Sequence, residues 1–300
     1  MSKSLDRHKL ANRSAIKVSF EFFPPNSAQM ETRLWQSVKK LAPLNPEFMS
    51  VTYGAGGSTR DRTRKTIVKM AQTSNLSVAA HLTCIGASKV QIDQTIEDFK
   101  SVGVEHIVAL RGDPASGIEG VYQPQGDGYA YASDLVRAIK SDRKMLVSVA
   151  GYPERHPQSR NWAEELDNLK RKVDAGADQI ITQFGFEAKL LSEYQERVSR
   201  AGLNIPIIPG IMLQPNFDGL VRMAKMCGAS IPKWMYELFE GTKDDQITRQ
   251  LLTASVIAEY CADLQEVGFN RFHFYTLNSA DFAYATCRLL GVKPVQEVSL

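Results

Sequence analysis

Short runs of apolar and β-branched residues alternate with longer amphipathic stretches along the whole chain. The short runs predict eight strands, at residues 17–22, 48–52, 78–83, 106–111, 146–151, 179–184, 206–212 and 272–277. The amphipathic stretches predict helices at 28–41, 58–74, 88–101, 131–140, 160–174, 187–201, 216–227, 244–267 and 279–290. Eight strands, each followed by a helix, are the pattern of a (β/α)8 TIM barrel, and a doubly wound sheet is the alternative.

The domain organisation follows from where this alternation is interrupted. No linker or shift in composition divides the chain, which favours a single barrel over residues 16–300. Residues 1–15 are polar and basic, and we expect them to form a flexible N-terminal arm. Residues 113–130 are rich in glycine and proline and follow a strand, which predicts a long functional loop. Residues 231–246 predict a short extra helix.

Composition and charge narrow the possible classes of function. The 300 residues are 43% hydrophobic and 23% charged, which is typical of a globular chain that needs no disulfide or metal to build a core. The net charge of +3 is too small to predict a nucleic-acid partner. No apolar run is long enough for a membrane span or a secretory signal. The four cysteines are dispersed, which predicts reduced thiols in a cytoplasmic protein.

Polar residues stand at the carboxyl ends of nearly all the predicted strands. In a TIM barrel these ends meet at one mouth, where active sites are found, so we expect the residues to share a pocket. They are Glu21, Thr52, His81, Thr83, Arg111, Asp113, Tyr152, Gln183, Thr276 and Asn278. A ring that mixes acids, bases and amides is better explained by a functional site than by loops that begin at those points.

Glu21 is the strongest single candidate for a catalytic residue. It lies in an aromatic-rich strand whose alternation places Ser19 and Glu21 on the same face, inside the barrel. Burial raises the pKa of a carboxyl group, so we expect Glu21 to hold a proton near neutral pH and to act as a general acid. A buried glutamate satisfied by hydrogen bonds is the structural alternative.

Other candidates allow structural explanations as well. His81 has no partner at metal-ligand spacing, so we expect no metal and a hydrogen bond to a cofactor or to the barrel wall. His273 lies between two phenylalanines and is expected to be structural. Arg111 and Asp113 either pair with each other or contact a phosphate and a heteroaromatic ring. The basic residues 170–172 end a helix, where cations are favoured in any case.

Taken together, these segments resemble methylenetetrahydrofolate reductases. The motifs run in order from about residue 17 to the C-terminus: SFEFFPP (19–25), VTYGA (51–55), HLTC (81–84), ALRGD (109–113), YASD (131–134), NLKRKVDAGA (168–177), TQF (182–184), IPGI (208–211) and FHFYTLN (272–278). The resemblance implies a bacterial-type catalytic TIM barrel that binds FAD at the strand carboxyl ends. It implies transfer of hydride from NADH or NADPH through the flavin to 5,10-methylenetetrahydrofolate, which gives 5-methyltetrahydrofolate.

The resemblance also implies roles for residues at matching positions. Glu21 would protonate the p-aminobenzoyl nitrogen and open the imidazolidine ring, and Asp113 would lie beside the flavin and the pterin. The implied FAD contacts are Thr52, Tyr53, Ala55, His81, Arg111, Gly112, Asp113, Tyr131, Ala132, Tyr152, His156, Glu165, Asn168, Arg171 and Lys172. The implied substrate contacts are Glu21, Asp113, Gln183, Gly219, Met223 and Ser279.

Four positions depart from the family's pattern. Glu165 stands where bacterial relatives often have Asp, and Ser279 stands where many carry Arg. Gly219 and Met223 stand where familiar relatives carry Gln and Phe. Losing an aromatic platform and a guanidinium weakens stacking and anion pairing. We therefore expect altered affinity for the nicotinamide or the folate tail, with the flavin site intact.

Two other functions remain open. A flavin-free folate barrel, such as a methyltransferase acting on methyltetrahydrofolate, explains a pterin site but not the cluster at residues 152–172. A folate- or flavin-binding homologue with weakened turnover explains the substrate-side departures, although the retained Glu21 and Asp113 argue against it. We also expect a homo-oligomer without the regulatory domain that eukaryotic relatives append, and with no nucleic-acid or membrane partner.

Overall fold

The computed structural model describes residues 15–54, 59–73, 76–114, 120, 122–142 and 144–295. Its strands are β1 (Lys17–Phe22), β2 (Met49–Val51), β3 (Val78–Thr83), β4 (His106–Leu110), β5 (Leu146–Gly151), β6 (Gln179–Thr182), β7 (Ile207–Ile208), β8 (Gly210–Met212) and β9 (Arg271–Tyr275). Its helices are α2 (Ala28–Leu41), the short 3₁₀ helix η1 (Ala42–Leu44), α3 (Arg60–Thr73), α4 (Lys89–Ser101), α5 (Ala132–Asp142), α6 (Trp162–Asp174), α7 (Ala188–Arg200), α8 (Phe217–Cys227), α9 (Lys233–Phe239), α10 (Gln246–Glu266) and α11 (Ala280–Leu289).

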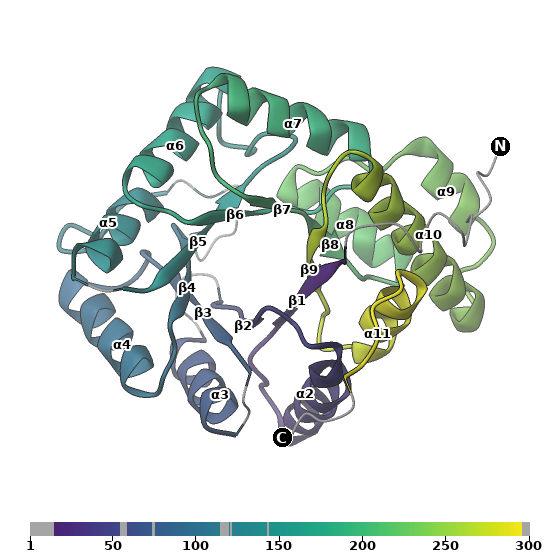
Figure 1. Cartoon of the computed structure of the whole chain (residues 1–300), viewed down its shortest axis with the longest axis horizontal. Coiled ribbons are helices and arrows are strands. Elements are labelled where there is room, and N and C mark those ends of the chain that lie inside the picture. The colour runs from purple at the N-terminus through teal and green to yellow at the C-terminus, as the bar shows by residue number, and fades with distance from the viewer. Residues whose placement is uncertain are drawn as a thin grey trace.

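The strands form one parallel sheet that curves into a barrel. Their order across the sheet is β7-β6-β5-β4-β3-β2-β1-β9-β8. β7 and β8 are two parts of one strand interrupted at Pro209, so the two edges of the sheet meet there and the ring closes. Figure 1 shows this ring at the centre with the helices outside it. The predicted single-domain (β/α)8 TIM barrel is confirmed, and the doubly wound sheet is excluded.

Alternation along β1 decides what lies inside the barrel. Val18, Phe20 and Phe22 are almost completely buried on the face toward the helices, where Phe20 stacks on a phenylalanine of β9 at 5.9 Å. Ser19 and Glu21 point the other way, into the barrel, because successive side chains of a strand face opposite sides. The same rule on neighbouring strands surrounds Glu21 with polar side chains.

Local signals set the limits of several helices. Ser88 begins α4 with a complete capping box, in which its hydroxyl accepts from the backbone of Gln91 and the Gln91 side chain accepts in return. Gly176 and Gly202 follow α6 and α7 with φ angles of 108° and 76°, a conformation that favours glycine and ends a helix. The extra helix predicted within residues 231–246 is α9.

Further predictions from the sequence concern membrane helices, the cysteines and the segments at residues 1–15 and 113–130. None of the helices in the described ranges is long and apolar enough to cross a membrane. All four cysteines are free thiols, as predicted. The predicted arm at residues 1–15 lies, apart from Ala15, outside the described residues, and so does part of the predicted loop at 113–130.

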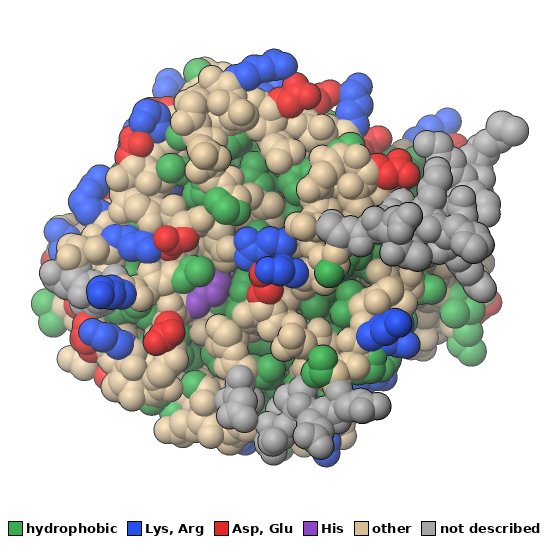
Figure 2. Space-filling model, in the orientation of Figure 1, with side chains coloured by type: hydrophobic (Ala, Val, Ile, Leu, Met, Phe, Trp, Pro, Cys, Tyr) green, Lys and Arg blue, Asp and Glu red, His purple; other side chains and the backbone are tan. Residues whose placement is uncertain are grey.

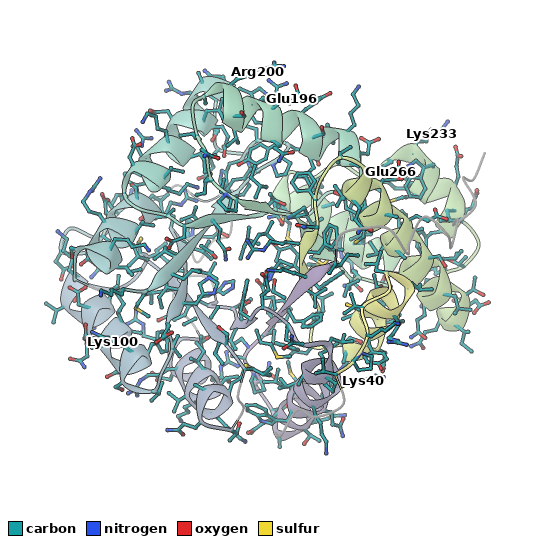
Figure 3. The ribbon with its side chains drawn as sticks, in the orientation of Figure 1. Lys40, Lys100, Glu196, Arg200, Lys233 and Glu266 are labelled. Carbon is teal, nitrogen blue, oxygen red and sulfur yellow. The ribbon has the colours of Figure 1, made fainter. Side chains whose placement is uncertain are left out.

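Charged residues lie mainly on the outer faces of the helices. The pair Arg200 and Glu196, 2.9 Å apart on α7, is a typical exposed ion pair at helical spacing (Figure 3). Such pairs contribute little to stability individually. On the face shown in Figure 2, basic, acidic and histidine side chains also gather near the centre, over the barrel. Charge at the barrel axis is the less usual feature, because parallel sheets are normally buried and apolar.

Candidate active site

A cavity of about 510 Å³ opens at the carboxyl ends of β2 to β5. Twelve of the predicted FAD contacts line it: Tyr53, Arg111, Gly112, Asp113, Tyr131, Ala132, Tyr152, His156, Glu165, Asn168, Arg171 and Lys172. Thr52 and His81 lie outside this lining, and Ala55 lies outside the described residues. The predicted cluster is therefore one pocket, assembled from the ends of several strands.

The residues after β4 form one wall of the cavity. Arg111 Nη1 donates to Gln158 Oε1 at 2.7 Å, and its guanidinium lies 4.5 Å from the centre of the Tyr122 ring. Arg111 Nη2 is 3.6 Å from Asp113 Oδ1, so the predicted ion pair is present but loose, and the Asp113 side chain is 48% exposed. Gly112 has a φ of 84°, and a Cβ there would meet β3 side-chain atoms at 2.9 Å. Only glycine fits this turn.

Helix α6 brings a cation and an anion to another wall. Lys172 Nζ donates to the carbonyl of Ala150 at 2.7 Å, and desolvation lowers the lysine pKa to about 8 although Glu165 opposes this. Glu165 Oε2 accepts hydrogen bonds from Ser159 Oγ at 2.7 Å and from the His156 backbone at 3.1 Å. One oxygen of this carboxylate, an implied FAD contact, is thus already engaged by the protein.

The two outer residues of α6 in this cavity are paired on the helix surface. Arg171 donates to the side chain of Asn168 and forms an ion pair with Asp167 at 2.9 Å. Both Arg171 and Asn168 nevertheless line the cavity. The same side chains can therefore form solvated pairs in the free protein and contact a ligand in a complex, because exposed pairs can exchange partners.

Aromatic rings flank the cavity on two sides. The Tyr53 hydroxyl accepts a hydrogen bond from Arg60 Nε at 2.9 Å, and Tyr131 is exposed just before α5. The ring of Tyr152 meets that of His156 edge to face, with 4.7 Å between centroids. Burial raises the pKa of Tyr152 and lowers that of His156. Both rings are therefore neutral groups that can hydrogen bond without adding charge.

One buried polar atom in the cavity wall lacks a partner. Thr83 Oγ1 makes no hydrogen bond with any described residue, although Thr83 lines the cavity at the end of β3. Buried hydroxyls are normally hydrogen bonded, so an unpaired one on a residue that lines a cavity is a candidate contact for a ligand. The sequence identified Thr83 as a strand-end residue but not as a cofactor contact. The lining residues Gly54, Tyr122, Ser133 and Gln158 were also missed, because they lie in loops or helix starts without a distinctive pattern.

Inside the barrel, residues of four strands meet at Glu21. Its Oε2 lies 3.2 Å from His81 Nε2 and 3.3 Å from His273 Nε2. His273 Nδ1 is 2.8 Å from Ser19 Oγ, and His81 Nε2 is 3.3 Å from Ser50 Oγ. The predicted hydrogen bond of His81 to the barrel wall is therefore present. His273, which was expected to be only structural, contacts the candidate acid.

The expectation that burial raises the pKa of Glu21 is wrong for this site. Burial does raise it, but the charge of His81 and hydrogen bonds from His273 and His81 outweigh burial and bring the pKa to about 2. Burial lowers the pKa of His273, against the opposing effect of Glu21. In the free protein Glu21 is thus a carboxylate beside His81, and His273 is neutral. The two histidines come from β3 and β9, so no local pattern around Glu21 reveals them.

The predicted substrate-side residues do not share one cavity. Gln183 lines a small cavity next to Tyr152, and its Oε1 accepts from the backbone of the following residue. Gly219 and Met223 lie one turn apart on α8, as predicted from their spacing. Ser279 lines a separate cavity of about 680 Å³ between α2 and α11. Among the residues with described positions, no group of three or more His, Cys, Asp or Glu is arranged to hold a metal ion.

Comparison with known proteins identifies close relatives over nearly the whole chain. The profile of the family described as Methylenetetrahydrofolate reductase matches residues 6–291. The 5,10-methylenetetrahydrofolate reductase of Escherichia coli K12 is 43% identical over 279 residues, which cover 93% of this chain and 92% of that protein. The Buchnera aphidicola (subsp. Acyrthosiphon pisum) enzyme of the same name is 40% identical over 95% of both chains. Methylenetetrahydrofolate reductase (NADH) 1 of Arabidopsis thaliana is 34% identical over 99% of this chain and 52% of its own length.

Solved structures with the same fold are more distant in sequence. A Clostridium thermocellum protein described as binding two copies of 5-methyl-5,6,7,8-tetrahydrofolic acid has a TM-score of 0.57 at 15% identity, over 96% of this chain and 98% of its own. Dihydropteroate synthase of Xanthomonas albilineans with 4-aminobenzoic acid has a TM-score of 0.51 at 13% identity, over 93% and 92%. At these identities the likeness shows the barrel fold alone.

Proposed function

The chain belongs to the methylenetetrahydrofolate reductase family, and from that membership we propose that it reduces 5,10-methylenetetrahydrofolate to 5-methyltetrahydrofolate with bound FAD and NADH or NADPH. The single observation that carries the proposal is the polar cavity at the ends of β2 to β5, in the same barrel as the acid cluster around Glu21. Sequence relatives supply the reaction, and the cavity supplies a place where a large, partly anionic cofactor can bind.

The residues of the cavity fit a flavin dinucleotide. Arg111, Arg171 and Lys172 supply cations for a diphosphate, and guanidinium groups match phosphate oxygens especially well. Thr83 Oγ1 offers a hydrogen bond that no described protein group takes up. Tyr152 supplies a buried ring. When bound, FAD supplies the hydride transfer between the nicotinamide and the folate, which no amino-acid side chain can perform.

We assign the proton transfer to Glu21. The imidazolidine ring of the substrate opens when its p-aminobenzoyl nitrogen is protonated, so the acid must carry a proton in the complex. Glu21 is a carboxylate in the free protein, and His81 Nε2 is close enough to pass a proton to its Oε2 when that imidazole carries one, whereas the neutral His273 only holds the carboxylate by a hydrogen bond. A bound substrate that excludes water raises the carboxyl pKa and favours that transfer.

We assign an electrostatic role to Asp113. Its carboxylate stands at the rim of the cavity, held loosely by Arg111. A negative charge beside the cofactor disfavours further negative charge on the cofactor, and this makes hydride donation easier. We also propose that the chain works in the cytoplasm, on the basis of its four dispersed free thiols.

The visible spectrum of the purified protein tests the proposal. We expect a bound-flavin spectrum that bleaches when NADH or NADPH is added without oxygen, and that returns when 5,10-methylenetetrahydrofolate follows. A flavin spectrum that neither nucleotide bleaches would contradict the proposed electron donors. A colourless protein that also fails to take up added FAD would overturn the reductase proposal and favour the flavin-free folate barrel.

A further inference from the structure

The chain turns sharply between β9 and α11, through two residues in the left-handed conformation. Leu277 and Asn278 have φ angles of 50° and 56°. Residues other than glycine rarely adopt this conformation, and those that do are mostly single asparagines or aspartates. Strained residues persist only where the surrounding contacts hold them, and they cluster at functional sites. The contacts that hold this turn therefore indicate its role.

The side chain of Asn278 holds the end of the strand that carries Glu21. Its Oδ1 accepts from the backbone N–H of Phe23 at 2.8 Å, and its Nδ2 donates to the carbonyl of Phe23 at 3.0 Å. Phe23 directly follows the last residue of β1. Because one amide satisfies both backbone groups, Asn278 takes the place of a peptide group of a neighbouring strand. It thereby holds the chain beyond the end of β1.

Thr276 binds the backbone of Glu21 itself. Its Oγ1 and its backbone N–H both donate to the Glu21 carbonyl, at 2.6 Å and 3.3 Å. The same hydroxyl accepts from the backbone N–H of Asn278 at 3.2 Å. Thr276 is completely buried and Asn278 nearly so. The turn therefore holds the chain both at Glu21 and two residues after it.

Helix α2 fixes the turn from the other side. The carbonyl of Asn278 accepts from Arg33 Nε and from Ser37 Oγ, both at 3.1 Å. α2 and α11 lie side by side, so the turn is enclosed between the helix that follows β1 and the helix that follows β9 (Figure 1). Both the side chain and the backbone of Asn278 are thus engaged, and the turn is fixed relative to the first βα unit.

This arrangement bears on Glu21 because its carboxylate must meet two histidines and a substrate atom. Glu21 Oε2 lies 3.2 Å from His81 Nε2 and 3.3 Å from His273 Nε2. These contacts hold one oxygen, whereas the position of the whole side chain depends on the backbone from which it extends. In an active site a displacement of about 1 Å can cost about 10²-fold in rate. A backbone held on both sides of Phe22 limits such a displacement.

We propose that Asn278, together with Thr276, is a positioning residue for Glu21, and that the turn after β9 fixes the backbone from which the proposed general acid extends. This inference rests on the proposed function, since it concerns the proton transfer assigned to Glu21. It also gives a different role to two strand-end residues that the sequence placed in the pocket. Neither Thr276 nor Asn278 lines the cavity at the carboxyl ends of β2 to β5, and their side chains bind the β1 segment instead.

Separate measurement of the two half-reactions tests the proposal. Asn278→Gly keeps the left-handed backbone and removes both bonds to Phe23. We expect it to slow the reoxidation of reduced flavin by saturating 5,10-methylenetetrahydrofolate about tenfold, with the half-saturating folate concentration and the bleaching by NADH or NADPH unchanged. Thr276→Val has a similar shape but loses the side-chain bond to Glu21, so it should slow the same step. Thr276→Ser keeps the hydroxyl and should not.

Asn45→Gly is the matched control. Asn45 has the same left-handed conformation, with a φ of 50°, but it follows η1 and lines the cavity at the amino end of the barrel. The substitution should leave both half-reactions unchanged. An equal loss in both half-reactions, an equal loss with Asn45→Gly, or normal reoxidation in both Asn278→Gly and Thr276→Val would overturn the proposal.

NMR of ¹⁵N-labelled histidines tests the positioning without any reaction. The Nε2 atoms of His81 and His273 face Glu21 Oε2, so their ¹⁵N shifts report where the carboxylate lies. We expect these shifts to change in Asn278→Gly and to remain those of the parent in Asn45→Gly, and unchanged shifts in Asn278→Gly would contradict the positioning role. If the parent shows no reductase activity, the proposed function fails instead. The histidine shifts then still decide whether the turn positions Glu21.

Discussion

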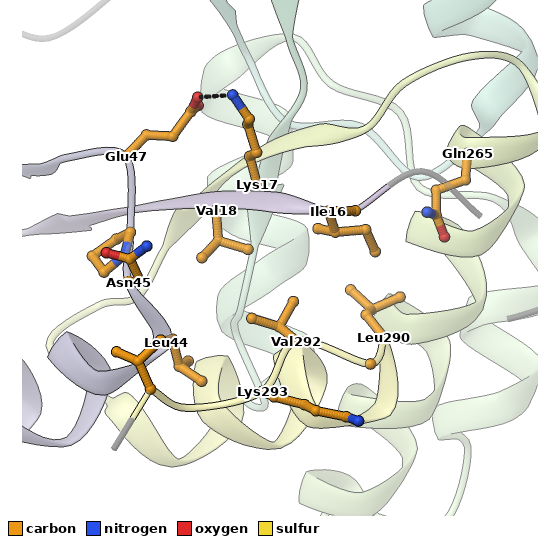
Figure 4. A pocket seen from close by; sticks show the side chains of 14 residues that line it. Ile16, Lys17, Val18, Leu44, Asn45, Glu47, Gln265, Leu290, Val292 and Lys293 are labelled. Atoms are coloured by element: carbon orange, nitrogen blue, oxygen red, sulfur yellow. Dashed lines mark ion pairs between the residues drawn. The ribbon is translucent and has the colours of Figure 1, made fainter. Parts of the chain in front are cut away.

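The two ends of the barrel carry cavities of similar size but of different chemical character. The cavity at the carboxyl ends of the strands measures about 510 Å³, and the one at the amino ends about 610 Å³. At the amino end, Glu47 pairs with Lys17 at 3.4 Å (Figure 4). Glu47 also pairs with Arg271 at 2.7 Å. Arg271 also donates to Gln179 at 3.0 Å. At the carboxyl end, by contrast, Thr83 Oγ1 has no partner among the residues that the structure describes, and the Arg111–Asp113 pair is loose.

The difference shows that volume alone does not identify a site. At the amino end the carboxylate of Glu47 is engaged by two cations, so a ligand that binds it would have to displace existing bonds. Polar atoms at the carboxyl end are left available, and a ligand can satisfy them. In TIM barrels the carboxyl end carries the active site and the amino end contributes stability. Substitutions at the two ends of the barrel test this division between an active carboxyl end and a stabilising amino end.

Replacing Glu21 should have the largest effect. For Glu21→Gln we expect kcat for folate reduction to fall about 10²–10⁴-fold, because the general acid is lost. Reduction of the flavin by NADH should continue, since that step needs no proton from Glu21. Stopped-flow absorbance separates the two half-reactions. Glu47→Gln is the matched control, a carboxylate at the other end of the same barrel, and an equal loss of activity there would contradict the division.

Replacing Arg271 should affect stability but not chemistry. Arg271→Met leaves Glu47 without its closest cation, and we expect the free energy of unfolding to fall by about 1–2 kcal/mol. This loss of stability is smaller than for a fully buried ion pair, because the side chains of Arg271 and Glu47 are 28% and 25% exposed. Urea denaturation measures it. FAD affinity and kcat should match those of the parent, and a selective loss of either would assign function to the amino end.

Lys172 should make FAD binding depend on pH. Its pKa of about 8 means that the ammonium group is charged below pH 8 and increasingly neutral above it. An anionic cofactor favours the charged form, so FAD affinity should fall by up to about tenfold per pH unit above pH 8. Lys172→Met should abolish that slope in a fluorescence titration. Lys170→Met is the control, since Lys170 pairs with Asp174 on the exposed side of α6.

The smallest effect should come from the unpartnered hydroxyl of Thr83. Thr83→Val removes a buried donor without a bond, so we expect the flavin-free protein to become more stable by up to about 1 kcal/mol. FAD affinity should fall a few-fold, because the cofactor loses a hydrogen bond. Thr286→Val is the matched control, because Thr286 Oγ1 is also buried and unpartnered but lies on α11. Equal effects of both variants on FAD would show that Thr83 does not face the cofactor.

The fold was accessible from the sequence because it depends on local patterns. The strands at 17–22, 78–83 and 146–151 were predicted to the residue, since runs of β-branched and apolar residues end there at turn residues. The predicted strand at 206–212 is divided, because Pro209 has no backbone N–H to donate to the ladder.

The site was only partly accessible, because its chemistry depends on contacts between distant segments. Strand ends identified Glu21 and Arg111 as candidates. The pKa of Glu21 was predicted in the wrong direction, since His81 and His273 approach it from other strands. Sequence periodicity places residues on faces but does not reveal which faces meet.

The pairing of β1 with β9 has a consequence for how this protein becomes active during folding. It joins residues about 250 positions apart, as the Ser19 and His273 contact shows with its separation of 254. Contacts of such long range form late, because the loss of chain entropy must be met before they contribute stability. Most βα units can form on the ribosome while β9 is still unsynthesised. Glu21 meets His273 only when the last strand closes the ring, so the polar cluster around Glu21 is complete in a finished barrel and not in a partly folded one.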